Sequence, residues 1–290
     1  MAWPEPVKGT IAFQGLPGAY SDLACRMAYP GMATLPCASF ETAMEAVREG
    51  TAALAMLPCE NSLAGRVPDI HHLLPGSGLF VIAEHFQRVE HCLLGVRGAA
   101  IGDIRRVHSH AVALGEVRHM LKSLGLTPVV QRDMAGSAEL VAGWGNRQDA
   151  AVASALAAEI YGLDILAANP GEGAEENTTR FLVMAARPGQ PAVTDPGVMT
   201  TFVFRTRNVP AALYKAMGGF ATNGVNITKL ESYMLDGEFT ATQFLCDADG
   251  HPEGAPLRRA LEDLAFFSSE VRILGVYRAA AYRLEKAAAA

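Results

Sequence analysis

The stretch Thr10-Ile-Ala-Phe-Gln-Gly-Leu-Pro-Gly-Ala-Tyr-Ser-Asp22 lies near the beginning of this sequence. The apolar run after Thr10 is typical of a buried strand, and Gly-Leu-Pro-Gly is typical of a turn. Ser21 and Asp22 are good N-cap residues for a helix that follows. A strand, a turn and a helix in this order predict an α/β fold.

The same alternation continues to about residue 185. Residues 40–49 carry apolar side chains at helical spacing, and 52–57 is typical of a buried strand that stops at Pro58. The polar segment after Pro58 should then lie at the carboxyl end of that strand, where open α/β sheets bind ligands. Further strands are predicted at 79–83, 91–96, 105–108, 128–131, 150–154 and 180–184, and helices at about 112–124, 136–143 and 155–161.

A second pattern follows a segment rich in Pro and Gly between Arg187 and Gly197, which indicates a linker. Beyond it, strands are predicted at 200–205, 224–234, 239–247 and 271–277, and helices at 209–222 and 255–264. This βαββαβ order predicts a small ferredoxin-like sandwich. We assign no function to the tail at 281–290.

The composition limits the classes of function. With 290 residues, 50% of them hydrophobic, the chain is long enough for two domains. A net charge of -6 argues against nucleic acid as a partner, and no apolar run reaches the roughly 18 residues that a membrane span needs. The amino-terminal residues lack the features of a secretory signal, so we expect a cytoplasmic protein.

The cysteines and histidines give no metal signature. Five cysteines are scattered and never paired as C-x-x-C, which predicts buried free thiols rather than disulfides or a zinc site. The histidines lack carboxylates or cysteines at ligand spacing. We therefore expect no metal.

Five polar segments lie where strands should end: 15–21, 58–62, 109–110, 136–137 and 177–181. Each has an ordinary alternative. The glycines of the first segment either form a plain turn or present N-H groups to an anion, and their spacing is not that of a dinucleotide site. Asn61 and Ser62 are of types that are common in turns, and His110 is equally compatible with a structural role. An arginine at the start of a strand, such as Arg180, is usually exposed to solvent.

The order and spacing of the whole set carry more information. Gly-x-Pro-Gly-x-x-Ser, Pro-x-Glu-Asn-Ser, Ser-His, Ala-Ala-Val-Ala-Ser with Tyr161-Gly-Leu, and Asn-x-Thr-Arg-Phe follow one another between residues 10 and 184. Together they resemble the prephenate dehydratase family. The second pattern resembles an ACT regulatory domain, with Val209-Pro-Ala-Ala-Leu and Gly224-Val-Asn-Ile-Thr-Lys-Leu-Glu-Ser232. A dehydratase followed by an ACT domain is the usual bacterial arrangement of this family.

The resemblance implies a cytoplasmic lyase that converts prephenate to phenylpyruvate in L-phenylalanine biosynthesis, with no cofactor. It implies a two-lobed catalytic domain like a type II periplasmic binding protein at 1–187, with lobes at about 1–84 plus 179–187 and about 85–178. A linker at 188–197, an ACT domain at 198–280 and a tail at 281–290 complete the expected organisation.

The resemblance also assigns site residues. Thr179 matches the catalytic Thr of the family, and we group it with Glu60, Asn61 and Ser62; the proton for the leaving hydroxyl comes from Thr179, a water or Glu60. Arg180 either binds a substrate carboxylate through two parallel hydrogen bonds or forms a structural pair. The other expected substrate-binding residues are Gly18, Ser21, His110, Ser137, Thr178 and Phe181.

Phenylalanine is the expected effector, bound by Ala211, Ala212, Leu213, Asn226, Glu231 and Ser232. The sequence departs from the family here: Ala211 stands where the family has Gly, and Tyr233-Met234 replaces Arg-Pro. Ala111-Val112 likewise replaces Pro-Gln after His110, and Gly136-Ser137 replaces Ser-Thr. The identity of the effector and the sign of its effect therefore stay open.

Other interpretations are compatible with the sequence. An arogenate dehydratase performs the same chemistry on a substrate with an amino group in place of the keto oxygen. A non-catalytic binding or sensor protein is a further alternative, because both folds bind small molecules elsewhere. The family resemblance predicts a homodimer or homotetramer, and the sequence does not distinguish the two.

Overall fold

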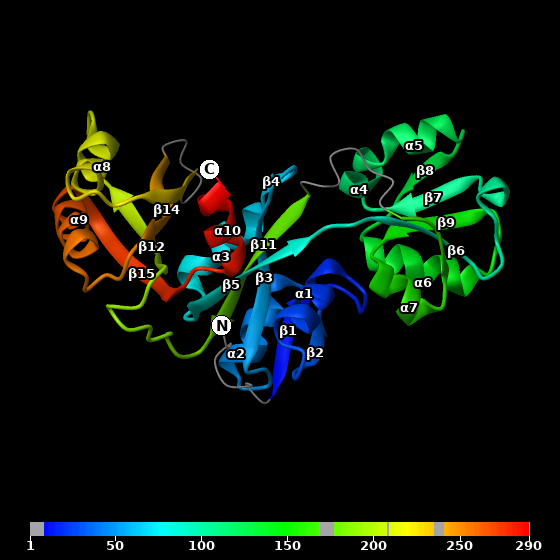
Figure 1. Ribbon diagram of the computed structural model, residues 1–290, viewed down its shortest axis with the longest axis horizontal. Helices are drawn as coiled ribbons and strands as arrows, with labels where there is room; N and C mark the ends of the chain where they lie inside the picture. The colour runs from blue at the N-terminus through cyan, green and yellow to red at the C-terminus, as the bar shows by residue number, and fades with distance from the viewer. Residues whose placement is uncertain (1–8, 169–176, 208, 235–240, 290) are drawn as a thin grey trace. The chain divides into compact units, whose positions relative to one another are not determined.

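The computed structural model describes residues 9–168, 177–207, 209–234 and 241–289 (Figure 1). The chain divides into two compact units. The first contains Met1–Val67 and Phe86–Phe181, and the second contains Pro68–His85 and Leu182–Ala290. Strands β5 (Phe80–Arg88) and β11 (Thr178–Ala185) contribute residues to both units.

The predicted strand, turn and helix at the amino-terminal end are confirmed. Strand β1 (Thr10–Gln14) lies between β2 (Ala33–Cys37) and β3 (Leu54–Asn61) and pairs with both in parallel. Ile11, Ala12 and Phe13 are fully buried, as expected for a strand with helices against its sheet. Helices α1 (Tyr20–Ala28) and α2 (Phe40–Arg48) come from the same unit.

The predicted N-cap of α1 is wrong. The helix begins at Tyr20, so its N-cap is Ala19, which forms no side-chain capping bond. Asp22 lies in the first turn instead, where its carboxylate accepts hydrogen bonds from the Gly18 N–H and from Arg26 Nε, both at 2.9 Å. A carboxylate at this place is also favoured by the helix dipole.

The predicted end of the third strand at Pro58 is wrong as well. Strand β3 continues through Pro58 to Asn61 and forms a hairpin with β4 (Gly65–Arg66). The Cys59 carbonyl accepts the Val67 N–H at 3.0 Å, so the backbone beyond Pro58 has a partner. Glu60 and Asn61 are therefore held in a strand rather than in a turn.

The second sheet of the first unit has the order β10 (Asp164–Ala168), β6 (Cys92–Gly95), β9 (Asp149–Ala153), β7 (Arg106–Ser109), β8 (Thr127–Val130). The helix predicted at 112–124 is divided into α4 (Ala111–Glu116) and α5 (Arg118–Ser123). Helices α6 (Met134–Trp144) and α7 (Ala155–Tyr161) lie where they were predicted. A short 3-10 helix spans Ile101–Asp103.

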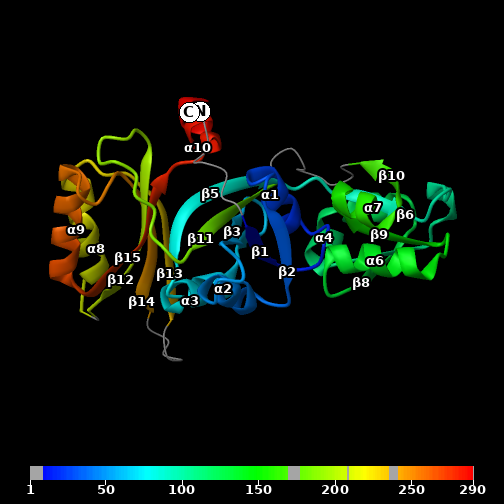
Figure 2. The same cartoon turned by 90° about the horizontal axis from the view of Figure 1, so that it is seen from below.

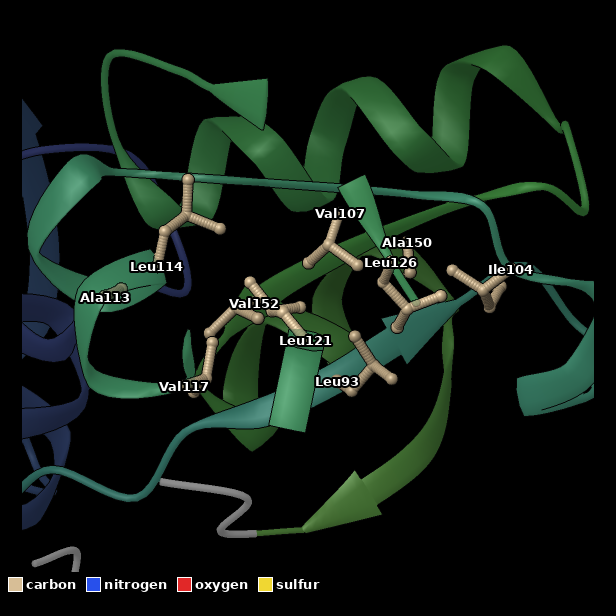
Figure 3. Packing of buried hydrophobic residues seen from close by; sticks show 10 residues of the cluster. All are labelled: Leu93, Ile104, Val107, Ala113, Leu114, Val117, Leu121, Leu126, Ala150 and Val152. Atoms are coloured by element: carbon tan, nitrogen blue, oxygen red, sulfur yellow. The ribbon is translucent and has the colours of Figure 1, made fainter. Parts of the chain in front are cut away.

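The core of this second sheet is aliphatic. Figure 3 shows side chains of β6, β7 and β9 facing those of α4 and α5. Leu93, Val107 and Val152 are fully buried, and each buried aliphatic side chain stabilises the fold by about 1.5–3 kcal/mol relative to exposure. This packing holds α4, and with it Glu116, against the sheet.

The second unit has the βαββαβ order predicted from the sequence. Its strands are adjacent in the order β13 (Ile227–Met234), β14 (Ala241–Asp249), β12 (Val198–Thr206), β15 (Ser268–Arg278), and all these neighbours are antiparallel. Helices α8 (Ala212–Thr222) and α9 (Ala255–Phe267) lie on one face of this sheet (Figure 2). Phe202 and Phe220 stack between sheet and helices.

Two helices of the second unit were not predicted. Helix α3 (Pro68–Gly76) contains Pro75, and helix α10 (Ala281–Ala289) follows β15. Arg283 of α10 donates from Nε to the buried Glu84 of β5 at 2.7 Å. In the part of the chain that is described, no helix is long and apolar enough to cross a membrane.

All five cysteines are buried free thiols, as the sequence predicted. Cys25 belongs to α1, Cys92 packs in the second sheet and Cys246 packs in the βαββαβ core. Burial raises the pKa of Cys25 and of Cys246 well above the ordinary thiol value. These thiols are therefore protonated at neutral pH.

Candidate functional site

The end of β3 and the start of β11 bring Asn61 and Thr179 together. Asn61 Nδ2 lies 3.0 Å from Thr179 Oγ1 and 2.7 Å from Asn177 Oδ1. Thr179 itself is partly exposed. Two of the polar segments singled out in the sequence, 58–62 and 177–181, thus meet at one place.

The Asn61 amide has a defined orientation. Its Oδ1 accepts hydrogen bonds from the backbone N–H groups of Leu63 at 2.9 Å and Ala64 at 2.8 Å. Because backbone N–H groups only donate, Oδ1 must face them and Nδ2 must face Thr179. The Thr179 oxygen therefore accepts from Asn61, and its own proton is left to donate to another group.

Ser62 and Thr178 join the β3–β4 hairpin to β11. The Ser62 N–H donates to the Thr178 carbonyl and the Thr178 N–H donates to Ser62 Oγ, both at 2.9 Å. This reciprocal pair holds the backbone on either side of Asn61 and Thr179. Ser62 therefore has a backbone role beside any contact with substrate.

Arg180 forms the structural pair that the sequence left open. Its Nη1 donates to Glu60 Oε1 at 2.9 Å, and its side chain is buried. Charged groups inside proteins require such partners. Phe181 is also buried and contributes to the core beside Arg180.

The Gly18 turn connects the two sheets of the first unit. Ser154 Oγ donates to the Gly18 carbonyl at 2.6 Å, and the Tyr161 hydroxyl donates to the Pro17 carbonyl at 2.9 Å. Gly18 has φ +87°, and a Cβ there would lie 2.8 Å from the Ala157 backbone. The Gly18 N–H is bound by Asp22, so it does not point at a ligand.

Three further residues expected to bind substrate lie in or directly before helices of the first unit. His110 is the N-cap of α4, where Nδ1 accepts from the Val112 N–H at 3.4 Å. Ser137 is buried, and its Oγ donates to the Asp133 carbonyl at 2.6 Å. Ser21 is buried in the first turn of α1.

Three further side chains extend the group around Thr179. Asn177 Nδ2 donates to Glu116 Oε2 at 2.8 Å, His91 Nε2 lies 2.7 Å from the same oxygen, and His91 Nδ1 lies 3.1 Å from the Tyr20 hydroxyl. The sequence predicted none of these interactions. Asn177 and Tyr20 stood inside the quoted motifs, but Glu116 is one acidic residue in a helix and carried no signal.

The expected effector residues lie in or directly before α8 and β13. Ala211 is the N-cap of α8 with φ 61°, a left-handed conformation that Gly adopts without strain. Asn226 Nδ2 donates to Asp249 Oδ2 at 2.9 Å. Tyr233, which replaces the expected Arg, is buried and accepts a 2.6 Å hydrogen bond from Gln243, while its ring contacts His72 edge to face. Ala212 and Leu213 open α8, and Glu231 and Ser232 lie on β13.

Within the described ranges, no group of three His, Cys, Asp or Glu side chains is placed to hold a metal ion. The polar groups around Thr179 are amides, hydroxyls, a carboxylate and an imidazole. Such groups suit hydrogen bonding and proton donation to an oxygen of a bound small molecule.

Comparisons with known proteins agree with these groups. A family model described as prephenate dehydratase matches residues 11–189. A Komagataeibacter europaeus protein named bifunctional N-acyl-homoserine lactone acylase/prephenate dehydratase is 61% identical over 273 residues, which cover 94% of this chain and 97% of that protein. The Arabidopsis thaliana arogenate dehydratase/prephenate dehydratase 1 is 37% identical over 284 residues, covering 93% of this chain and 72% of the relative.

A solved structure extends the likeness to the fold. The prephenate dehydratase of Arthrobacter aurescens in complex with L-Phe superposes with a TM-score of 0.83 at 30% identity. The alignment covers 93% of this chain and 90% of that one. The similarity therefore includes the βαββαβ part as well as the two sheets of the first unit.

Proposed function

Because this chain belongs to the prephenate dehydratase family, a family of lyases, we propose that it converts prephenate to phenylpyruvate in L-phenylalanine biosynthesis. The reaction removes the ring hydroxyl as water and one carboxylate as carbon dioxide. The bond from the ring to the carboxyl carbon breaks, its electron pair enters the ring, and the hydroxyl leaves with a proton.

The hydroxyl of Thr179 is the observation that carries the proposal. Asn61 donates to its oxygen, so its proton is directed elsewhere, and a substrate hydroxyl is the natural acceptor. Hydroxide is a poor leaving group, and a hydrogen bond or proton at its oxygen lowers the barrier. Thr179 supplies the hydrogen bond, and the proton itself comes from Thr179, a water or Glu60.

The test compares Thr179→Ala with Thr179→Ser. Purified protein is mixed with prephenate, and phenylpyruvate is followed by its absorbance in alkali. We expect Thr179→Ala to keep the fold and lose activity by about two orders of magnitude or more, and Thr179→Ser to retain most of it. Near wild-type turnover by Thr179→Ala would contradict the assignment. Binding of prephenate by the wild type without turnover would favour the sensor alternative.

Arogenate is the alternative substrate. The Arabidopsis thaliana relative, which is 37% identical to this chain, carries a name with both activities. The two substrates differ in the side chain, where arogenate has an amino group. Parallel measurements of kcat/KM on prephenate and arogenate separate the alternatives, and a higher value on arogenate would replace the proposed substrate.

N-acyl-homoserine lactone hydrolysis is a second candidate activity, favoured by the 61% identity to the Komagataeibacter europaeus protein. The enzyme would cleave the amide bond with water and release a fatty acid and homoserine lactone. Chromatography of purified wild type and Thr179→Ala with the same substrate tests it. Loss of this activity only in the variant would place both reactions at one site.

We further propose that residues 198–280 form an ACT regulatory domain after a catalytic domain at 1–187. The βαββαβ order and the likeness to the Arthrobacter aurescens protein, whose structure contains L-Phe, support it. Titration of activity with phenylalanine, tyrosine and tryptophan identifies the effector. We also propose a homodimer or homotetramer in the cytoplasm; light scattering after gel filtration measures the oligomeric state.

A further inference from the structure

Six side chains of the first unit form a continuous hydrogen-bonded network that ends at the Thr179 hydroxyl. Five contacts of 2.7–3.1 Å connect them. We call it the Thr179 network, and in spatial order its members are Tyr20, His91, Glu116, Asn177, Asn61 and Thr179. These residues come from α1, α4, β3 and β11, with His91 between β5 and β6 and Asn177 directly before β11.

The donor and acceptor in each contact on the Thr179 side are determined by the backbone. Asn61 Oδ1 accepts from the Leu63 and Ala64 N–H groups, so both hydrogens of Nδ2 are donated, one to Thr179 and one to Asn177 Oδ1. Asn177 then has its Nδ2 directed at Glu116 Oε2. The orientations of both amides between the β3–β4 hairpin and Glu116, those of Asn61 and Asn177, are therefore determined.

The donor and acceptor on the other side follow from the Glu116 carboxylate. Glu116 Oε2 accepts from Asn177 Nδ2, so we assign His91 Nε2 as a second donor to it and the Tyr20 hydroxyl as the donor to His91 Nδ1. Burial, more than the neighbouring charges, raises the pKa of Tyr20, which keeps its phenol protonated as a donor. His91 and Asn177 are 5% and 3% exposed, so water competes little for these bonds.

We propose that Glu116 is a positioning residue for catalysis, which orients Asn177 and Asn61 so that Thr179 presents its O–H to the substrate. The inference rests on the proposed dehydratase activity. Without an acceptor at Glu116, the Asn177 amide is free to rotate and to place an N–H group against Asn61 Nδ2. Two donors repel each other, and Asn61 then loses its fixed contact with Thr179. Small errors in the position of a reacting group are costly to the rate.

The experiment exchanges the donor and acceptor between Asn177 and Glu116. Asn177→Asp keeps the acceptor for Asn61 but places a second carboxylate beside Glu116. The double variant Asn177→Asp/Glu116→Gln puts an amide opposite the new carboxylate, which restores one donor and one acceptor with the same net charge. The His91 imidazole adapts to the new amide by taking the tautomer with its proton on Nδ1.

We expect Asn177→Asp to lower kcat on prephenate by about 100-fold with KM changed less than about threefold, and the double variant to recover about tenfold or more. Glu116→Gln alone keeps the acceptor oxygen and should lose less than Glu116→Ala. A fall in kcat with little change in KM, together with recovery in the double variant, distinguishes a positioning role from loss of folding. Thermal unfolding of each variant measures whether the fold is kept.

Tyr20→Phe tests the far end of the network with a change that keeps the buried ring. We expect a kcat decrease of about three- to tenfold, and Tyr29→Phe, at the end of the same helix, is the matched control with unchanged kcat. Wild-type turnover of prephenate tests the proposed function by itself. If the wild type is active but Asn177→Asp and Glu116→Ala keep kcat within about twofold, or the double variant recovers nothing, the positioning role is wrong.

Discussion

Arg180 Nη1 lies 2.9 Å from Glu60 Oε1, and the Arg180 side chain is 2% exposed while Glu60 is 32% exposed. A guanidinium this deeply buried depends on its carboxylate partner. The pair also lies one residue from both Asn61 and Thr179 along their strands. The Glu-Asn-Ser and Thr-Arg-Phe motifs therefore combine a structural pair with the Asn61–Thr179 contact to which we assign the chemistry.

Removal of Glu60 should affect stability before chemistry. We expect Glu60→Ala to lower the free energy of unfolding by about 2–3 kcal/mol, because it takes a charged partner from buried Arg180, and Glu60→Gln to cost less since an oxygen acceptor remains. Urea denaturation measures both. Glu45→Ala, which removes an exposed partner of Arg48, is the control and should change stability by less than about 1 kcal/mol. A fully stable Glu60→Ala without activity would instead give Glu60 a direct role with substrate.

Substitution of Gly18 should separate backbone strain from steric contact. Gly18→Ala adds a Cβ 2.8 Å from Ala157 Cα at a φ of +87°. We expect this substitution to lower the free energy of unfolding by about 3 kcal/mol. Gly50 has a similar φ of +78° with no atom within 4 Å of a built Cβ. Gly50→Ala should therefore lower the free energy of unfolding by only about 1 kcal/mol. Thermal unfolding of both variants measures the two losses. Equal losses would mean that α1 and α7 adjust to the added methyl group.

The buried Asp149 should give the protein a measurable acid sensitivity. Hydrogen bonds from Arg106 at 2.7 and 2.8 Å, followed by one from His108, lower the pKa of Asp149 to about 2 from 3.8. A depressed folded-state pKa stabilises the fold above the unfolded value of 3.8, and this contribution is lost as the pH falls through 2.

We expect wild type to lose roughly 2 kcal/mol more unfolding free energy than Asp149→Asn between pH 5 and pH 2. Asp149→Asn itself should be less stable at pH 7. Chemical denaturation across this range is the measurement, with Glu285→Gln on α10 as the control. An identical pH dependence of wild type and Asp149→Asn would show that the carboxylate is not stabilised by its partners.

Ala211→Gly should stabilise the protein. Ala211 has φ 61°, where an L-side chain is strained and glycine is not, so we expect a gain of about 1 kcal/mol in unfolding free energy. Ala221→Gly, in the exposed part of the same helix, should lose about 1 kcal/mol by contrast. If Ala211→Gly destabilises, the left-handed conformation is not strained at this position.

The parts of the fold with regular apolar spacing were predictable from sequence. The strand at Thr10–Gln14 and the whole βαββαβ order follow from local patterns, because each element buries one side of a continuous segment. Strand β2 and helix α3 were missed, since Pro36 lies inside the first and Pro75 inside the second. Proline normally ends such elements, and tertiary packing overrides this tendency.

The candidate site was predictable only where the motifs themselves meet. The Asn61 to Thr179 contact joins residues 118 positions apart, and both lay in quoted motifs. Glu116 and His91 became visible only in space, because a single acidic residue on a helix and a single histidine after a strand have many ordinary explanations. The continuation of β3 beyond Pro58 depended on pairing with β4, which no local pattern indicates.

The buried thiols allow local opening of the fold to be measured in the unmodified protein. A cysteine reacts with an alkylating reagent only as an exposed thiolate, and Cys25, Cys92 and Cys246 lie in three different packed regions. The rate at which each is modified in the native protein therefore reports how often its own region opens. Mass spectrometry of the three peptides would show, without any substitution, which region loosens first when substrate or an amino acid is added.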